Sequence, residues 1–176
     1  MAFILSGVGG NVISFAEYQD ALDRDQRVFE ANEGLTDVII EDILVRSTQR
    51  ILNNFATTDW WRNYYLRQSA GTYDPLIYTS GLLAIPAPNP DNIMARQADF
   101  TDLCVYFAFA NYIMPKIADF SQQDNAERVK IGFYNEKYRS MFQELIDDGS
   151  WYDFSGDGNI TNKEKMPTRS NVVRVR

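Results

Sequence analysis

The sequence predicts a mainly α-helical protein: a bundle of about five helices with a long central loop or hairpin, an acidic loop and an extended C-terminal tail. Three observations carry this prediction. Apolar residues recur at helical spacing in several segments that are separated by capping and turn residues. Four of the six prolines fall within residues 69–95. An Asp- and Gly-rich stretch after residue 150 then ends the helical pattern.

The composition allows a packed core and argues against several kinds of chemistry. The chain has 176 residues, with eleven Phe, ten Tyr and three Trp. It has no histidine, and Cys104 is its single cysteine, so we expect neither a zinc site nor an internal disulfide. Cys104 stands in "DLCVYFAFANYIM", which predicts a buried, unreactive thiol. Glu41/Asp42 and Asp147/Asp148 are adjacent pairs that diverge on a helix. We therefore expect no enzyme.

Charge and hydropathy predict a soluble protein made in a cytoplasm. The apolar run at the N-terminus follows no basic region, and residues 103–114 are too few to span a bilayer. The net charge is −7. Four of the 17 basic residues and no acidic ones lie in 165–176, which leaves 13 basic against 24 acidic residues elsewhere. Such an acidic body is not expected to bind nucleic acid.

The N-terminal half is predicted to form three helices. "SFAE" (Ser14 to Glu17) has the pattern of a capping box, with Ile13 as a staple residue, for a helix over about 15–32 that Gly34 ends. Thr36 is expected to cap a second helix over about 37–55, and Thr58 or Asp59 a short third one through "WWRNYYLRQ". The expected buried faces are Phe15, Tyr18, Leu22, Val28 and Phe29, and then Ile39, Ile43, Leu44, Ile51 and Phe55.

The C-terminal half is predicted to add two longer helices. Residues 69–95 form a long excursion, with a possible hairpin around "LIYTSGLLAI". The apolar helix over about 92–118 belongs at the centre of the bundle, and Pro115 should kink it or end its regular part. After a turn, a helix over about 122–147 runs to Gly149. Its expected apolar face is Val129, Phe133, Tyr138, Phe142, Leu145 and Ile146.

These segments predict an N-terminal arm (1–13), a helical bundle domain (14–150) with the long loop 69–95, and a calcium-type loop with an extended C-terminal tail (151–176). The arm contains "SGVGG", which lacks the Lys-Ser/Thr of a phosphate-binding loop. The segment "DWWRNYYLRQ" combines four large aromatic residues with Arg62 and Arg67. Such residues can stack on nucleic-acid bases, or they can form part of the core and of a subunit interface. The acidic body of the chain favours the core and interface role.

The acidic stretch "WYDFSGDGNITNKEK" matches the frame of a calcium loop. Asp153, Ser155, Asp157, Gly158, Ile160, Thr161 and Glu164 occupy positions 1, 3, 5, 6, 8, 9 and 12 of its twelve residues. Calcium requires six to eight oxygen ligands. The candidate metal ligands are Asp153, Ser155, Asp157, Asn159, Thr161 and Glu164, with Asn159 acting through its carbonyl.

Two interpretations of this loop remain open. Pro167 prevents a normal exit helix, so the ion would be a structural Ca²⁺ in a lone loop, bound weakly at about 10⁻⁴ to 10⁻³ M. The alternative is a tight Asp/Gly turn without an ion, held by side-chain hydrogen bonds.

The end of the chain, "NVVRVR", alternates apolar and basic residues. Val173 and Val175 would lie on one side of a strand, and Arg174 and Arg176 on the other, which suits addition to the sheet edge of an acidic partner. Arg169 adds to the basic character of this candidate partner-binding segment. The alternative is a disordered terminus.

Taken together, "ARQADFTDLCVYFAFANYIMPKIADF", the following long helix and "FQELIDDGSWYDFSGDGNIT" resemble the head–tail connector (adaptor, or head-completion) proteins of tailed bacteriophages. The resemblance covers roughly 15–165. It implies a small, mostly helical structural virion protein that forms a ring, usually of twelve copies, below the portal and joins capsid to tail. It also implies contacts with the portal protein and with a tail-side connector or tail terminator, a location in the virion neck, and assembly in the host cytoplasm.

In such a ring, an acidic inner wall would let DNA pass through the channel without specific binding. The competing class is a calcium-dependent protein-binding module with a single EF-hand-like loop, against which Pro167 counts. A small cytosolic enzyme is a third class, for which the sequence offers no catalytic constellation.

Overall fold

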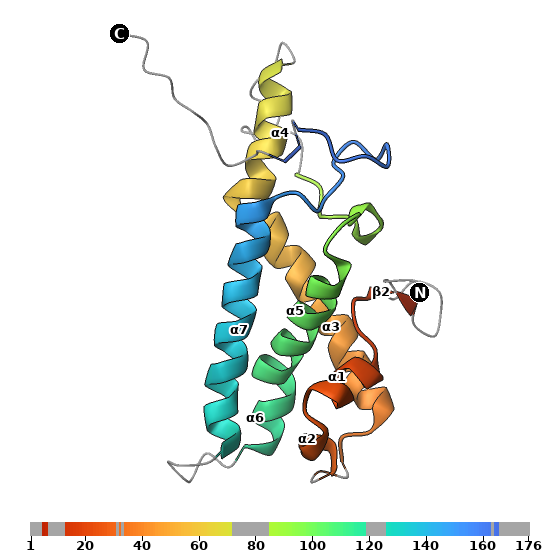
Figure 1. The fold of residues 1–176 in the computed structure, drawn as a ribbon, viewed down its shortest axis with the longest axis vertical. Helices are drawn as coiled ribbons and strands as arrows, with labels where there is room; N and C mark the ends of the chain where they lie inside the picture. The colour runs from red at the N-terminus through yellow and green to blue at the C-terminus, as the bar shows by residue number, and fades with distance from the viewer. Residues whose placement is uncertain are drawn as a thin grey trace. The chain divides into compact units, whose positions relative to one another are not determined.

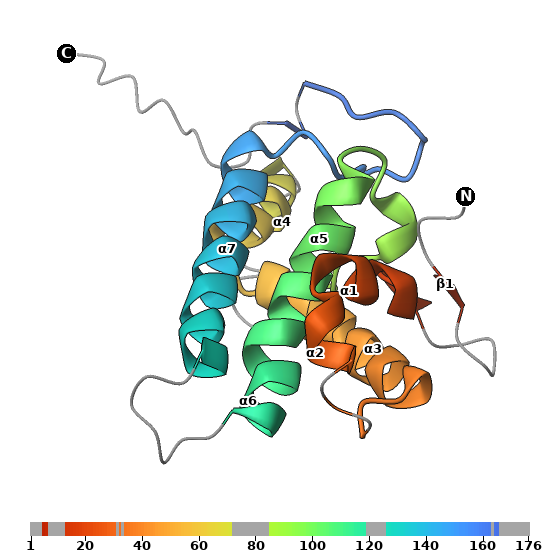
Figure 2. The same cartoon turned by 60° about the horizontal axis from the view of Figure 1, so that its bottom comes forward.

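The computed structural model describes residues 5–6, 13–30, 32, 34–71, 85–118, 126–162 and 164–165 (Figures 1 and 2). These residues are mainly helical, which confirms the predicted mainly α class. The chain forms two compact units. Unit 1 comprises Met1–Ile51 and Arg96–Glu144, and unit 2 comprises Leu52–Ala95 and Leu145–Arg176. Helices α3 (Asp37–Ala56) and α7 (Ala126–Asp148) contribute residues to both units.

Helix α5 (Gln97–Ala108) is the core of unit 1. Every residue from Leu103 to Ala110 is buried, so the helix has no face left for solvent over two turns. In both views of the ribbon α5 lies between α7 and α1 (Tyr18–Arg24) (Figures 1 and 2). The predicted start near residue 92 is wrong, because α5 begins only after Arg96, which has a left-handed backbone (φ 56°).

The regular part of this helix ends before Pro115, as the sequence predicts. A π-helical turn, Phe109–Ile113, follows α5 and leads into the short α6 (Met114–Ile117). Proline has no N–H and its ring collides with the carbonyl one turn earlier, and a π-turn is one way to absorb that conflict. The side-chain amide of Asn111 donates to the Phe107 carbonyl oxygen at 3.0 Å within the same turn.

The single helix predicted over 15–32 is wrong: the segment forms α1 and α2 (Gln26–Glu30), separated at Asp25. The Asp25 carboxylate accepts from Lys130 Nζ at 2.5 Å and from the Tyr134 hydroxyl at 3.1 Å, both on α7. Burial raises the pKa of Tyr134, and the charge of Asp25 raises it further, which keeps the phenol protonated as a donor. The break between the two helices therefore lies at the residue that contacts α7.

The predicted capping role of Ser14 is also wrong. Ser14 belongs to strand β2 (Ile13–Ser14), which pairs antiparallel with β1 (Leu5–Ser6), and its hydroxyl donates to the Ala16 carbonyl. Helix α1 begins instead after Glu17, whose N–H donates to the Asp20 carboxylate at 2.8 Å. The cap is thus formed three residues later than predicted, with aspartate in the role that Glu17 was expected to fill.

Segment 14–16 is fixed between α3 and α5 by buried polar groups. The Phe15 N–H donates to Thr48 Oγ1 at 3.0 Å, and Thr101 Oγ1 donates to the Phe15 carbonyl at 2.9 Å. The Cys104 thiol lies 3.4 Å from both Thr48 Oγ1 and the Leu44 carbonyl oxygen. Burial raises the pKa of Cys104 to about 12, so the prediction of a buried, unreactive thiol agrees with its surroundings.

Two of the predicted apolar faces need correction. On α3, Ile39 was expected in the buried face but is 38% exposed, and its neighbour Ile40 is buried instead. On α7 the buried positions in unit 1 are Tyr134 and Tyr138, which pack against Phe109 and Phe107 at centroid distances of 4.8 and 5.0 Å. Val129 and Phe133 are 70% and 52% exposed. An apolar residue every four positions fits more than one stripe on a long helix, and packing selects only one of them.

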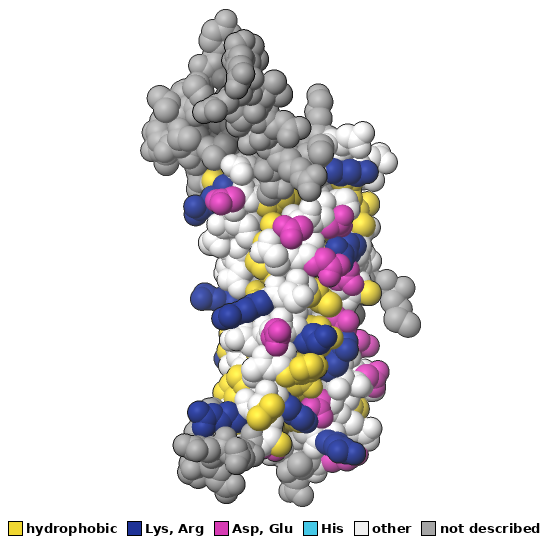
Figure 3. Space-filling model, turned by 60° about the vertical axis from the view of Figure 1, so that its left-hand side comes forward, with side chains coloured by type: hydrophobic (Ala, Val, Ile, Leu, Met, Phe, Trp, Pro, Cys, Tyr) yellow, Lys and Arg dark blue, Asp and Glu magenta, His cyan; other side chains and the backbone are white. Residues whose placement is uncertain are grey.

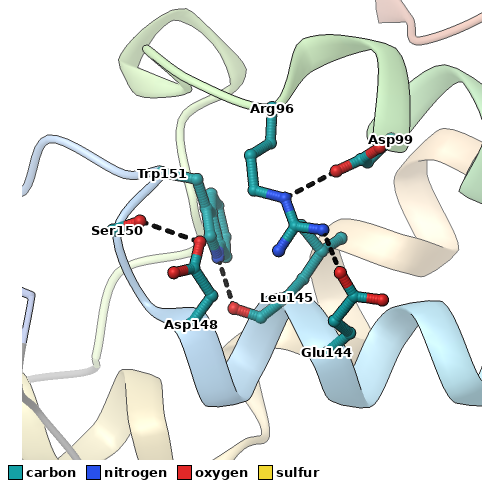
Figure 4. Close-up of polar contacts among 7 residues, drawn as sticks. All are labelled: Arg96, Asp99, Glu144, Leu145, Asp148, Ser150 and Trp151. Atoms are coloured by element: carbon teal, nitrogen blue, oxygen red, sulfur yellow. Dashed lines mark hydrogen bonds and ion pairs between the residues drawn. The ribbon is translucent and has the colours of Figure 1, made fainter.

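Arg96 links the start of α5 to α7 within unit 1 (Figure 4). Its guanidinium bonds the carboxylates of Asp99 and Glu144, each at 2.5 Å. Burial acts to lower the pKa of Arg96, but the hydrogen bonds to Glu144 and Asp99 outweigh it and raise the pKa. A left-handed backbone is costly for arginine, and this two-carboxylate contact offsets that cost.

In unit 2 the described segments are α4 (Asp59–Gly71), a 3₁₀ turn at Pro90–Asn92, and the loop after α7. Thr58 Oγ1 accepts from the Trp61 N–H at 3.3 Å, which confirms Thr58 as the cap of α4. Gly149 ends α7 with φ 59°, as predicted. The proposed hairpin, from Leu76 on, lies almost wholly outside the described residues, as does the turn at 119–125.

We predict that Gly149→Ala destabilises the protein by more than about 1 kcal/mol, because the site combines positive φ with no free space. A Cβ there would lie 2.8 Å from Trp60 Nε1 and 3.1 Å from the Lys165 carbonyl oxygen. Gly132→Ala is the matched control: no atom lies within 4 Å of its Cβ position, inside α7. It should stabilise by up to about 1 kcal/mol. Urea unfolding followed by far-ultraviolet circular dichroism measures both, and equal effects would contradict the assigned role of Gly149.

Candidate functional site: an acidic loop on an aromatic cluster

Unit 2 contains a cluster of large aromatic side chains from α4 and from the segment after α7. We call Trp60, Trp61, Tyr64, Trp151, Tyr152 and Phe154 the aromatic cluster. Its three tryptophans are at most 1% exposed, which confirms the predicted core role of "DWWRNYYLRQ" for Trp60 and Trp61. Phe154 stacks on Tyr64 at a centroid distance of 3.8 Å and an interplanar angle of 19°. The cluster therefore anchors the first residues of the acidic loop to α4.

Main-chain hydrogen bonds attach the entry of the loop to residues 92–95. The Asp153 N–H donates to the Asn92 carbonyl at 2.9 Å, and the Met94 N–H donates to the Trp151 carbonyl at the same distance. Ile93 and Tyr152 form an antiparallel bridge between them. This pairing explains why the predicted helix over 92–118 starts late: the main chain of Asn92, Met94 and Ala95 is hydrogen-bonded to the entry of the loop, and Ile93 forms the bridge.

Most polar tips of the cluster find backbone partners. The Trp61 and Trp151 indoles donate to the Pro86 and Leu145 carbonyls, both at 2.7 Å, and Figure 4 shows the second of these bonds. The Tyr152 hydroxyl accepts from the Asn89 N–H at 2.9 Å. Among the described residues, the buried Trp60 Nε1 has no hydrogen-bond partner. The cluster thus fixes both the loop and the segment from residue 86 to residue 95.

Asp153 organises the first half of the loop. Its carboxylate accepts from the N–H groups of Gly156 and Gly158, at 2.8 and 2.7 Å, and from Ser155 Oγ at 3.1 Å. Gly156 and Gly158 both have positive φ, which lets their N–H groups turn inward. Burial acts to raise the pKa of Asp153, but these hydrogen bonds outweigh it and lower the pKa below its usual value.

Glu164 closes the second half in the same way. It accepts from the Ser155 N–H at 2.9 Å, the Thr161 N–H at 2.7 Å and Thr161 Oγ1 at 2.6 Å. Burial would raise the pKa of Glu164, but the bonds from Thr161 and Ser155 lower it overall. Ser155 donates to both carboxylates, by its hydroxyl to Asp153 and by its N–H to Glu164, and so joins the two ends of the loop.

The two carboxylates are held as buried anions beside Tyr64. Asp153 and Glu164 are 2% and 3% exposed. Burial raises the pKa of Tyr64, and the charges of Glu164 and Asp153 raise it further. Each carboxylate uses three of its roughly four acceptor positions on groups of the loop. The arrangement can hold a fixed loop shape and negative charge, and it leaves about one acceptor position on each carboxylate for a cation.

The structure brings together four of the six predicted metal-ligating residues: Asp153, Ser155, Thr161 and Glu164. Asp157 and Asn159 are exposed, and the Asp157 carboxylate accepts from the Asn159 N–H at 2.8 Å. Among the described residues no three acidic, cysteine or histidine side chains form a metal-binding group. A calcium site would also use hydroxyl and carbonyl oxygens, so calcium binding stays a prediction.

The structure does not describe the predicted partner-binding residues. Arg169, Val173, Arg174, Val175 and Arg176 are beyond the described residues, and so is Pro167. Asn89 and Asn92, which the sequence did not single out, hold Tyr152 and Asp153 through backbone atoms. Backbone contacts of this kind leave no residue-type signal. The one local signal that could have indicated order here is the Asn-Pro step at the 3₁₀ turn, where Asn89 Oδ1 accepts from the Asp91 N–H.

We predict that Asp153→Asn lowers stability by about 2 kcal/mol even in the presence of a chelator, because the carboxylate accepts three charge-assisted hydrogen bonds. Asp157→Asn is the matched control on the same loop and should change stability by less than about 0.5 kcal/mol. Equal losses for the two variants in thermal melts with EDTA would contradict the organising role of Asp153.

Wild type and the Asp153→Asn variant also test whether Asp153 stabilises the loop as a charged carboxylate. The folded-state pKa of Asp153 is depressed, so its stabilisation is fully present above the unfolded value of about 3.9 and is lost as the pH falls through the folded value. The difference between wild type and Asp153→Asn should therefore shrink below about pH 4.

The site is thus a hydrogen-bonded acidic loop held on a buried aromatic cluster. Within the described part of the chain no helix is long and apolar enough to cross a membrane. No protein-family model, curated protein or solved structure matches the chain.

Proposed function

We propose that this chain is a structural head–tail connector (adaptor) of a tailed bacteriophage, which forms a ring below the portal and continues the DNA channel from capsid to tail. Its partners are further copies of itself, the portal protein and a tail-side connector or terminator. It acts in the virion neck, in a structural role without catalysis. The bundle of about five helices, the calcium-type loop and the extended C-terminal tail belong to the same proposal.

The observation that carries this proposal is where the connector-like segments fall in the fold. "ARQADFTDLCVYFAFANYIMPKIADF" supplies the buried helix α5 with its π-turn and α6. "FQELIDDGSWYDFSGDGNIT" supplies the end of α7, the Gly149 stop and the entry of the anchored loop. The resemblance thus rests on residues that determine the architecture, as expected for kinship with a family of structural proteins.

The distribution of charge also supports a channel protein. Outside 165–176, acidic residues outnumber basic ones by 24 to 13. An acidic ring wall repels the phosphate backbone, so DNA can slide past without being held. The carboxylates of Asp153 and Glu164 are fixed by hydrogen bonds, so their charge stays in place when other charges approach.

The loop from Asp153 to Glu164 is proposed to take a structural Ca²⁺ that fixes the direction in which the chain leaves the loop. We predict that about 5 mM calcium raises the melting temperature of the wild type, since binding at about 10⁻³ M stabilises by about 1 kcal/mol. Asp157→Ala should abolish this increase while leaving the melt in EDTA nearly unchanged. Asn162→Ala, next to a predicted ligand but not one itself, should keep the increase. If calcium does not change the melting temperature of the wild type, the loop is the ion-free turn held by its own hydrogen bonds.

A truncation after Lys165 tests the connector role. It removes Arg169, Val173, Arg174, Val175 and Arg176, the residues proposed to bind the portal as an added strand. We predict unchanged helix content by circular dichroism and loss of incorporation at the neck in particles imaged by electron microscopy. Arg174→Glu with Arg176→Glu should weaken docking most at low salt, where charge attraction is least screened. A truncated chain that assembles at the wild-type level would refute the role of the tail in portal binding. A full-length chain that is missing from the neck would refute the connector function.

A further inference from the structure

The chain contains two Asp-Gly steps, Asp148–Gly149 and Asp157–Gly158, and no Asn-Gly step. An Asp-Gly pair is chemically reactive, because glycine has no side chain that keeps its backbone nitrogen away from the preceding carboxyl group. The nitrogen can bond to the carboxyl carbon and close a succinimide ring. Both steps combine an exposed aspartate with a glycine at positive φ, 59° for Gly149 and 83° for Gly158. Their surroundings decide which of the two can react.

The two glycines differ in how they are packed. Gly149 is buried, and its N–H donates to the Leu145 carbonyl at 3.0 Å at the end of α7. Trp60 Nε1 and the Lys165 carbonyl oxygen lie 2.8 and 3.1 Å from the position of a Cβ there. Gly158 is exposed, and beyond its chain neighbours no atom lies within 4 Å of its Cβ position. Water can therefore reach the second step, and no packed side chain restrains it at this position.

Hydrogen bonds of the loop hold both reacting groups of the second step. The Gly158 N–H donates to Asp153 Oδ2 at 2.7 Å, and the Asp157 carboxylate accepts from the Asn159 N–H at 2.8 Å. The nitrogen must lose its proton to form a new bond to carbon, and in the closed loop this proton is bound by a buried carboxylate. Its removal would leave a negative nitrogen beside the Asp153 anion, which like-charge repulsion disfavours.

The charge of Asp153 is not neutralised by a basic side chain. On the face of the molecule shown in Figure 3, acidic and basic side chains are interspersed. The ion pairs among the described residues nevertheless all lie outside the loop, at Arg24, Arg46, Arg96 and Lys130. Asp153 is held instead by N–H groups and by the Ser155 hydroxyl. Its negative charge therefore adds to the cost of removing the proton from the Gly158 nitrogen.

We propose that Asp157–Gly158 is a self-modification site that the closed acidic loop protects. When the loop opens, the Gly158 nitrogen gives up its proton and bonds to Cγ of Asp157, and the hydroxyl of the protonated carboxyl group leaves with a proton as water. Water then adds to the former main-chain carbonyl of the succinimide, and the bond from this carbonyl to nitrogen breaks. The product is isoaspartate, whose main chain runs through Cγ. One water is released and one is taken up, so the net change is an isomerisation.

Isoaspartate prevents the loop from closing again. The rearrangement adds one carbon to the main chain and takes one from the side chain, so the carboxylate moves away from the Asn159 N–H and the Gly158 N–H moves away from Asp153. Hydrogen bonds of 2.8 and 2.7 Å do not survive a displacement of a full carbon–carbon bond. Each opening that leads to reaction is thus recorded permanently in the chain. The inference goes beyond the proposed connector function and does not depend on it.

Ageing of the full-length chain at constant pH and in EDTA tests this inference. Peptide mapping by electron-transfer mass spectrometry measures isoaspartate at Asp157 and at Asp148, and the ratio of the two rates is the readout. In urea-unfolded wild type the two steps should react at similar rates. In folded wild type the rate at Asp157 should be at least about tenfold below the unfolded rate, which corresponds to about 1.4 kcal/mol for opening the loop.

Two variants separate opening of the loop from unfolding of the whole chain. Asp153→Asn removes the charge and an acceptor at Gly158, so the rate at Asp157 should rise severalfold while Asp148 keeps its wild-type rate. Asp99→Asn is the matched control, because it removes a hydrogen-bonded acid from unit 1, and it should leave the ratio unchanged. Equal rises at both steps in Asp153→Asn would overturn the inference, since unfolding of the whole chain would then expose Asp157. A ratio unchanged by Asp153→Asn, or a folded wild type that reacts as fast as the unfolded chain, would overturn it as well.

Discussion

A helix that is apolar on every side is stable in water only if other segments cover it on every side, and unit 1 is arranged around this constraint. Residues 103–110 of α5 and its π-turn are all buried, and neighbouring segments meet this continuous helix through specific groups. Phe15 packs on Phe100 from the N-terminal segment, Thr48 approaches Cys104 from α3, and Tyr134 stacks on Phe109 from α7. The elements of unit 1 follow from the need to enclose one helix.

Enclosing α5 requires polar connections at its borders, where neighbouring segments must pack closely without leaving unpaired groups. Thr48 and Thr101 satisfy both backbone groups of Phe15, and Asp25 joins the break between α1 and α2 to α7. Arg96 connects the start of α5 to Asp99 and to Glu144 of α7. In unit 2 the carboxylates of Asp153 and Glu164 have the same role within the acidic loop. Hydrogen-bonded acids thus fix segments for which no regular secondary structure is available.

Much of this architecture was predictable, because helix ends depend on local chemistry. The residue types of Thr58 and Gly149 predict a helix cap and a helix end, and the continuous apolar run of α5 indicates a central helix. The break at Asp25 was not predictable, because the residues that Asp25 contacts there, Lys130 and Tyr134, are more than a hundred positions away in the sequence. The exposure of Val129 and Phe133 was missed for a related reason: periodicity identifies apolar stripes, but it does not say which stripe faces this core.

The acidic loop shows the same limit at a finer scale. The spacing of Asp153, Ser155, Thr161 and Glu164 predicted that their oxygens converge, and these side chains do come together. The spacing could not indicate that N–H groups of Gly156, Gly158 and Thr161 would occupy much of their acceptor capacity, because a calcium loop and a hydrogen-bonded turn use the same residue types. Whether the loop holds an ion depends on whether the free energy of calcium binding exceeds the free energy that the internal hydrogen bonds contribute.

The location of the tryptophans has a spectroscopic consequence. All three tryptophans of the chain belong to the aromatic cluster of unit 2, with Trp60 and Trp151 only 4.8 Å apart. Their emission therefore reports the environment of one unit alone. The core of unit 1 contains phenylalanine and tyrosine and would be nearly silent at wavelengths that excite only indole. Comparing that emission with the far-ultraviolet signal of all helices would reveal whether the two units unfold together or in sequence.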